Sequence, residues 1–291
     1  MTGLFAVTRA LHFFSAMTLF GASAFGLLLR SRLQRGTGLP RSFFALCAAV
    51  ALLTTLLTLG FVADQMTGTA DAIFDPALWG AVARDTLYGE LALVRAALFL
   101  MFLLCVWLRP DWTLRAGTIL GGAALVLLGP TSHASRSVAS QYVFLLAAND
   151  SVHLLAGGFW LGALVALLPA TLAKPHDIPE LLTRLRLFSV WGMAAVGVLV
   201  LAGTANAVAI LDIQGMPWSE TYLDWLAIKL VLAAVMIALA LTNRFGLMPA
   251  IARGDKEAGE TLRWTLFAEL SCAALILLAV GILGLTAPMQ M

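Results

Sequence analysis

Eight long apolar runs occupy most of this chain, and they constrain its fold more than any other feature. They cover approximately residues 4–29, 43–63, 89–108, 114–131, 143–172, 187–211, 223–243 and 264–286. A helix needs about 20 mainly apolar residues to cross the hydrocarbon core of a bilayer, and each run reaches or approaches that length. The strands of a membrane barrel would alternate apolar and polar residues, which these runs do not do. The sequence therefore predicts an all-α integral membrane protein with eight transmembrane helices.

The composition excludes a water-soluble globular domain. Charged residues make up 12% and hydrophobic residues 61% of the chain, whereas soluble domains carry about 25% charged residues. So few charges do not build a water-facing surface, but a surface that faces lipid needs none. The net charge of +2 gives no indication of nucleic-acid binding. We expect no nucleic-acid partner, and the lipid bilayer is the environment the sequence requires.

The distribution of charge between the runs predicts how the chain is oriented. Connections on the cytoplasmic side of a membrane are enriched in Lys and Arg. Thirteen basic residues lie in the odd-numbered connections and two, Arg84 and Arg136, in the even-numbered ones. The sequence therefore predicts that both termini lie outside, which in a bacterial inner membrane means the periplasm. The basic residues of the odd-numbered connections are Arg30, Arg32, Arg35, Arg41, Arg109, Arg115, Lys174, Arg184, Arg186, Arg244, Arg253, Lys256 and Arg263.

The two halves of the chain resemble one another. His12 in the first run and His153 in the fifth are each followed nine residues later by Gly-Ala. The third and seventh runs also correspond, whereas the second and sixth match poorly; the matching pairs are Glu90 with Asp224 and Arg95 with Lys229. Four spans per half is an even number, so both halves enter the membrane from the same side. We expect two parallel four-helix halves, 1–131 and 132–291, with His12 and His153 at one depth and facing one another across a seam.

Ionisable side chains inside hydrocarbon are costly and are functional candidates by default. Neutral imidazole is a common ligand of copper and zinc, so the repeated histidines His12 and His153 predict a metal site. Their alternative role is hydrogen bonding to a neighbouring helix backbone. His176 is predicted to be a solvated loop residue. The ionisable residues singled out within the runs are Arg9, His12, Arg95, Asp150, His153 and Lys229.

Two further residues belong to the predicted metal site. Asp150 lies one helical turn before His153, where it would orient the imidazole, supply an oxygen ligand or pair with Arg9. His133 follows the fourth run in an outer connection and is either an entry ligand or an ordinary solvated histidine. The ten methionines are scattered singly, which is typical of packing residues. We find no P-loop, GxGxxG, HExxH or CxxCH motif, so we expect no enzymatic activity.

A series of short motifs follows a fixed order along the chain. They are Arg9-Ala-Leu-His12-Phe, Ser132-His133-Ala134, Asp150-Ser-Val-His153, Trp160-Leu-Gly162-Ala-Leu, Gly203-Thr-Ala, Lys229-Leu and Thr242-Asn243-Arg244. In this order they resemble the bacterial copper resistance protein D (CopD) family. The likeness covers most of the chain and is strongest at 130–250. Tyr222-Leu-Asp224 departs from the expected Tyr-Gly pattern, which Tyr88-Gly89 keeps, and this leaves only the local loop geometry in doubt.

The resemblance implies an inner-membrane protein that moves copper, as Cu(I) or Cu(II), between periplasm and cytoplasm. It also implies a small periplasmic copper carrier as partner, and metal-site roles for the matched residues His12, His133, Asp150 and His153. Two alternatives remain open. Two facing histidines would suit a b-type haem in a membrane electron carrier, and the chain would otherwise be a structural or sensory subunit without a ligand.

Overall fold

The protein is a bundle of long helices. The computed structural model describes residues 2–34, 36–131, 142–172, 178–212 and 219–286. Within these ranges it contains helices and no strand, and eight of its helical segments are long and apolar enough to cross a membrane. The prediction of eight spanning helices is confirmed. The long helices are α1 (Thr2–Leu33), α2 (Arg41–Thr67), α4 (Leu87–Leu108), α5 (Thr113–Val126), α7 (Val143–Leu172), α8 (Ile178–Asp212), α9 (Glu220–Thr242) and α11 (Lys256–Leu283).

Several helices extend past the apolar runs that predicted them. α8 begins at Ile178 and α11 at Lys256, each about two turns before its run. Hydropathy does not register these turns because they are polar, yet local contacts stabilise them as helix. The Asp255 side chain caps α11 by accepting from the backbone N–H groups of Glu257 and Ala258.

The long connection between α2 and α4 folds into two short elements that the sequence does not predict. They are η1 (Ala70–Phe74) and α3 (Pro76–Asp85). Asp75 accepts from the N–H of Ala77, and Pro76 occupies the first helical position, so α3 has a well-formed N-terminus. α3 packs its short apolar face on the end of α2. The remaining short elements are η2 (Pro110–Trp112), η3 (Gly129–Thr131), the π-helix η5 (Asn243–Leu247) and α10 (Met248–Ala252).

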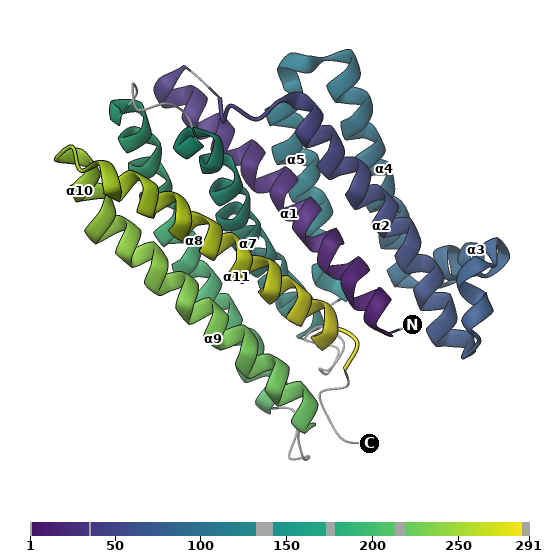
Figure 1. Cartoon of the computed structure of the whole chain (residues 1–291). Helices are drawn as coiled ribbons and strands as arrows, with labels where there is room; N and C mark the ends of the chain where they lie inside the picture. Colours follow the sequence, from purple (N-terminus) through teal and green to yellow (C-terminus); the bar gives the residue numbers. More distant parts are fainter. Residues whose placement is uncertain (1, 35, 132–141, 173–177, 213–218, 287–291) are drawn as a thin grey trace.

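α1 occupies the centre of the bundle. In Figure 1, α2, α4 and α5 lie to one side of it and α7, α8, α9 and α11 to the other. Glycines allow this close packing, because a Cβ at Gly162 of α7 would collide with the backbone of Gly21, and one at Gly121 of α5 would stand 3.3 Å from the Phe20 Cα. The small-xxx-small spacing of Gly117–Gly121 and Gly158–Gly162 in the sequence predicts close helix contact, and the structure confirms it.

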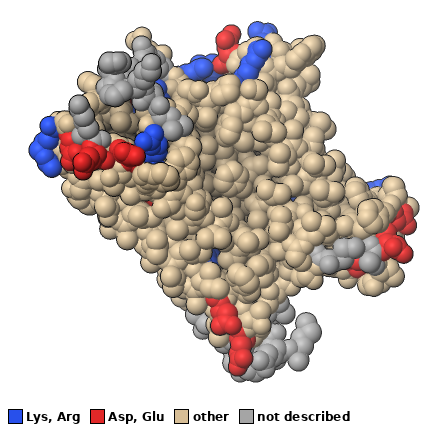
Figure 2. Space-filling model, in the orientation of Figure 1, with Lys and Arg blue, Asp and Glu red and all other residues tan. Residues whose placement is uncertain are grey.

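The two ends of the bundle differ in charge. α1 begins and α11 ends at one end, which we call the terminal end; α10 lies at the other, which we call the α10 end (Figure 1). On the face shown in Figure 2, Lys and Arg gather at the α10 end, together with some acidic residues, while Asp and Glu predominate at the terminal end and on α3. The band between is almost free of charge, as expected of a surface that faces hydrocarbon.

Candidate functional site

A cavity of about 310 Å³ lies between the helices in the terminal half of the bundle. α1, α4, α7, α8, α9 and α11 all contribute side chains to its wall, so both sides of the bundle meet there. Three of the four predicted metal-site residues, His12, Asp150 and His153, line this large cavity. The fourth, His133, lies outside the described residues.

His12 is buried on α1 with one of its two ring nitrogens occupied. Its Nδ1 lies 3.2 Å from the Ala51 carbonyl oxygen and 3.1 Å from the Thr54 hydroxyl, both on α2. A carbonyl only accepts, so the neutral ring carries its proton on Nδ1 and leaves the lone pair on Nε2. Nε2 is buried and makes no hydrogen bond to any described residue. This nitrogen is therefore the available ligand atom of His12.

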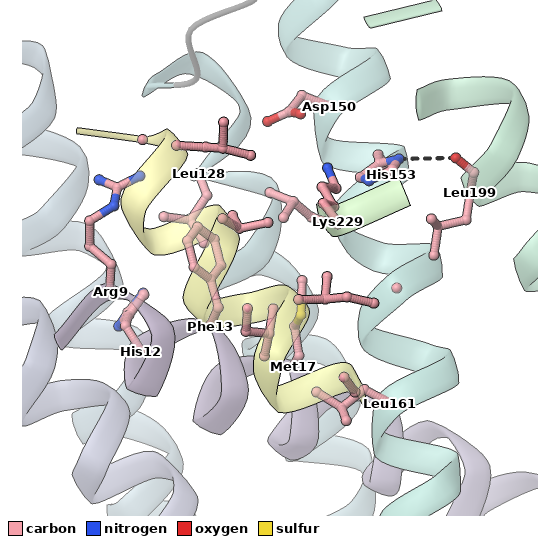
Figure 3. A pocket seen from close by; sticks show the side chains of 18 of the residues that line it. Arg9, His12, Phe13, Met17, Leu128, Asp150, His153, Leu161, Leu199 and Lys229 are labelled. Carbon is pink, nitrogen blue, oxygen red and sulfur yellow. Dashed lines mark hydrogen bonds between the residues drawn. The ribbon is translucent and has the colours of Figure 1, made fainter. Parts of the chain in front are cut away.

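His153 repeats this arrangement on α7. Its Nδ1 lies 3.1 Å from the carbonyl oxygen of Leu199 on α8, which again directs the lone pair of the neutral ring to Nε2. Gly203, one turn further along α8, leaves room for the ring, because a Cβ there would stand 3.1 Å from the His153 Cε1. Figure 3 shows the bond between His153 and Leu199 at the edge of the cavity.

The two imidazoles lie on opposite sides of the cavity. In Figure 3, His12 and Arg9 stand on one side and His153, Lys229 and Asp150 on the other, with Phe13 and Met17 between them. α1 and α7 pack along one another, but each histidine bonds to a different neighbouring helix through Nδ1. The structure therefore brings the pair to one cavity without placing the rings in contact.

Asp150 belongs to a polar network beside His153. Its carboxylate accepts from the Asn206 side-chain amide at 3.0 Å, and the Asn149 side chain donates to the Asn206 Oδ1 at 2.7 Å. Its charge also attracts the ammonium of Lys229. The acceptor that orients Nδ1 of His153 is the Leu199 carbonyl rather than this carboxylate. Asp150 thus places its carboxylate at the cavity wall.

Positive charge outnumbers negative charge in the wall. Arg9, Arg95 and Lys229 all line the large cavity, and Asp150 is the acidic residue that lines it. Arg95 is 1% exposed, with its guanidinium carbon 5.7 Å from the ring centre of Tyr88. The charges of Arg95 and Arg9 act on His12, and that of Lys229 acts on His153. Three basic side chains and one carboxylate thus share the cavity wall.

Two methionines line the same cavity. Met17 of α1 and Met236 of α9 are 7% and 3% exposed, and both line the large cavity. Methionines stand singly along the sequence, as packing residues do, so the sequence alone does not mark these two as ligands.

Glu269 of α11 is a buried ionisable residue that the sequence analysis does not include. It interrupts the apolar run 264–286 and is 0% exposed.

The described residues contain no group of three or more His, Cys, Asp or Glu side chains arranged to hold a metal ion. A site in this part of the chain must therefore combine imidazole with other ligand types. Thioether sulfur from the two methionines and a single carboxylate are the groups at hand in the cavity. Soft thioether and imidazole ligands suit Cu(I).

The fold and the cavity define a class of protein: a multi-pass helical membrane protein with one buried and one half-buried histidine at the same cavity. Two family models match the chain, one described as "Copper resistance protein D-like, N-terminal domain" over residues 1–143 and one as "Copper resistance protein D" over residues 182–283. The chain belongs to the copper resistance protein D family.

Two curated relatives match along nearly their whole length. The chain is similar to "Copper resistance protein D" of Pseudomonas syringae pv. tomato, with 32% identity over 94% of this chain and 93% of the relative. It is also similar to "Inner membrane protein YebZ" of Escherichia coli (strain K12), with 28% identity over 96% of this chain and 97% of the relative. No solved structure matches the chain.

Proposed function

We propose that this protein binds copper in the inner membrane and carries it between periplasm and cytoplasm, without catalysing a reaction. One observation carries the proposal: His12 and His153 both donate from Nδ1 to a backbone carbonyl and keep Nε2 for a ligand. Histidines that bind metals almost always donate their other ring N–H to such an acceptor. The names of the two relatives, one for copper resistance and one for the inner membrane, support the cargo and the location.

The lining of the cavity supplies the proposed ligands. His12 and His153 stand on opposite sides, so copper would contact them in turn rather than together. Met17 and Met236 offer soft sulfur along the way, which favours Cu(I) in the cavity. Asp150 attracts the incoming cation beside His153. His133 remains a proposed entry ligand on sequence grounds.

The environment of the two histidines supports the proposed parallel repeat. Each ring bonds to a carbonyl of the second span in its own half, Ala51 in one and Leu199 in the other. Each has a cationic neighbour from the third span of its half, Arg95 or Lys229. Corresponding residues thus line the cavity from both halves, namely the pairs Tyr88 with Tyr222, Arg95 with Lys229 and Thr58 with Asn206.

The charge asymmetry of the bundle supports a periplasmic location for both termini. Basic residues gather at the α10 end (Figure 2), which is typical of the cytoplasmic side. The large cavity then lies in the periplasmic half, within reach of a small periplasmic copper carrier. Delivery by such a carrier is part of the proposal.

Metal analysis of the purified protein tests the proposed site. We expect the wild type to bind Cu(I), and His12→Ala and His153→Ala each to weaken binding at least about tenfold. His176→Ala, predicted from the sequence to be a solvated loop residue, is the matched control and should bind as the wild type does. Wild-type protein that binds no copper above background, or a double histidine variant that binds normally, would refute the proposal.

The positive wall of the cavity favours one other candidate, a b-type haem. Arg9 and Arg95 would balance the carboxylates of the haem, and imidazole Nε2 atoms would ligate the haem iron. Phe13 and Met17 stand between the two histidines (Figure 3), which is unfavourable for one ring held by both. An absorbance spectrum of the purified protein decides the matter, since a strong Soret band identifies haem and copper(I) protein is colourless.

A further inference from the structure

A buried carboxyl group on α11 lies outside the proposed copper site. Glu269 is 0% exposed, and the Asn243 amide donates to its Oε1 at 2.6 Å. Its other oxygen, Oε2, is buried and has no hydrogen-bond partner among the described residues. Buried polar atoms are nearly always paired, so an unpaired carboxyl oxygen requires an explanation.

Asn243 has a second polar neighbour besides Glu269. The Thr265 hydroxyl lies 2.6 Å from the Asn243 Oδ1 and 2.8 Å from the Leu262 carbonyl oxygen, and its single proton serves one of the two at a time, while the Asn243 amide N–H faces Glu269. Asn243 begins the π-helix η5, which joins α9 to α10. Such π-segments are rare in helices and are frequently found at functional sites. The chain therefore adopts an uncommon backbone form where it contacts this carboxyl group.

Glu269 lies between two cavities. A small cavity of about 120 Å³ towards the α10 end is bordered by Leu266 of α11 and by Asn243, while Ala273 of α11 borders the large cavity. Glu269 follows Leu266 by three residues and precedes Ala273 by four, so all three share one helix face. Trp160 of α7 lines both cavities. The carboxyl group is thus part of the partition between them.

No charged side chain among the described residues neutralises this carboxyl group. On α11 the nearest charged residues, Glu260 and Arg263, are 4.0 Å from one another near its start. Arg244 of η5 donates to the Ser189 hydroxyl of α8 instead. The titratable groups that line the large cavity from the other helices packed against α11 are Arg9, His12, Asp150, His153, Tyr222 and Lys229. The others on those helices, Arg30, Arg32, Glu220 and Asp224, are exposed near the helix ends.

We propose that Glu269 is a proton-binding site in the partition between the two cavities. An ionised carboxylate in hydrocarbon must be paired or must bind a proton, and Glu269 has a single neutral amide as partner. Oε2 carries the exchangeable proton, and Asn243 holds Oε1 in both states. A role for this proton in driving copper movement rests on the proposed function, whereas proton binding itself does not.

Infrared spectroscopy of the reconstituted protein at neutral pH tests the proton site. We expect a carbonyl stretch of a protonated carboxylic acid that shifts in D2O and is absent from Glu269→Gln. This variant keeps an acceptor oxygen for Asn243, so it preserves the observed hydrogen bond. Glu260→Gln, on an exposed part of the same helix, should retain the band. A band that persists unchanged in Glu269→Gln overturns the proposal.

Carbodiimide labelling of the unmodified chain gives a second test that needs no folded variant. The O–H of a protonated carboxyl group adds across a C=N bond of dicyclohexylcarbodiimide, and the product rearranges to a stable N-acylurea with no leaving group. Peptide mass spectrometry should find this adduct on Glu269 and not on the exposed Glu260. An unlabelled Glu269 counts against a protonated carboxyl group.

Proteoliposomes with an internal pH dye test the link to copper. We expect Glu269→Gln to bind Cu(I) as the wild type does. Copper-dependent proton movement should be at least about tenfold slower in this variant than in the wild type. If the wild type binds no copper while the infrared band and the adduct are present, the proposed function fails and the proton site stands. If copper binds and both the infrared band and the carbodiimide adduct are absent, the proton site is refuted and the proposed function stands.

Discussion

Gly162 of α7 lies directly on Gly21 of α1, so close that a Cβ at Gly162 would stand 2.5 Å from the Gly21 Cα. Real Cβ atoms do not approach backbone this closely, so either helix must move to admit a side chain. The contact lies nine residues after each of the two histidines. It therefore sets the spacing of the helices that carry the candidate metal ligands.

Gly162→Ala should separate α1 from α7 and lower the free energy of unfolding by about 2 kcal/mol, as overpacking does in other tightly packed interiors. Thermal unfolding in detergent, followed by intrinsic fluorescence, measures the change. Gly197→Ala on α8 is the matched control, because a Cβ there meets nothing within 4 Å. Equal unfolding midpoints for the two variants would contradict the close contact.

Gly203→Ala should disturb His153 while leaving the fold intact. The added methyl group would stand 3.1 Å from the His153 Cε1, and the ring must shift from the Leu199 carbonyl to admit it. We expect Cu(I) affinity to fall roughly tenfold, as it does when an orienting partner is lost. Competition with a Cu(I) chelator measures this, with Gly197→Ala again as control. Unchanged affinity would show that the His153 orientation is unimportant for binding.

Lys229→Leu should strengthen copper binding. The Lys229 charge lines the cavity and acts on His153, so its removal lessens the repulsion of a cation and frees Asp150. A tenfold gain, about 1.4 kcal/mol, is the expected size. Arg263→Leu removes an exposed positive charge at the start of α11 and should leave the affinity unchanged. Weaker or unchanged copper binding by Lys229→Leu would contradict this prediction.

Arg184→Ala should destabilise the α10 end of the bundle. Arg184 of α8 contacts the Glu180 carboxylate at 2.6 Å and donates to the Gly36 carbonyl at 3.0 Å, which ties α8 to the connection after α1. The Arg184 and Glu180 side chains are 8% and 20% exposed, so the pair is partly buried, and loss of its charged hydrogen bonds should cost about 2 kcal/mol. Arg263→Ala breaks an exposed pair at 4.0 Å and should cost less than about 0.5 kcal/mol. Similar unfolding midpoints for the two variants would disprove this difference.

Reporter fusions test the orientation. Alkaline phosphatase needs disulfides and is therefore active only in an oxidising compartment such as the periplasm. A fusion after Met291 should be active, and a truncated fusion after Gly254, beyond α10, should be inactive. Fluorescent-protein fusions at the same two points should show the reverse pattern. The opposite outcome would place the basic α10 end outside.

The eight helices follow from the sequence because a span is a local property. Each apolar run registers within about 20 residues, whatever the rest of the chain does. Hydropathy along the sequence does not predict helix in polar segments, such as the first turns of α8 around Arg184. It also does not predict a short helix such as α3, which depends on packing against α2. His12 and His153 stand out for a related reason, since a histidine in hydrocarbon is conspicuous within its own run.

The sequence by itself determined the class of fold, the charge asymmetry between the ends of the bundle and two of the candidate ligands. Only the tertiary structure decided that Nδ1 of each histidine is bound to a carbonyl, that Met17 and Met236 share the cavity with them, and that Glu269 lies between two cavities. Apolar periodicity shows that a residue faces the interior of a bundle, not which residues from other helices meet it there. That choice depends on helix packing, which here follows from glycine contacts such as Gly21 with Gly162.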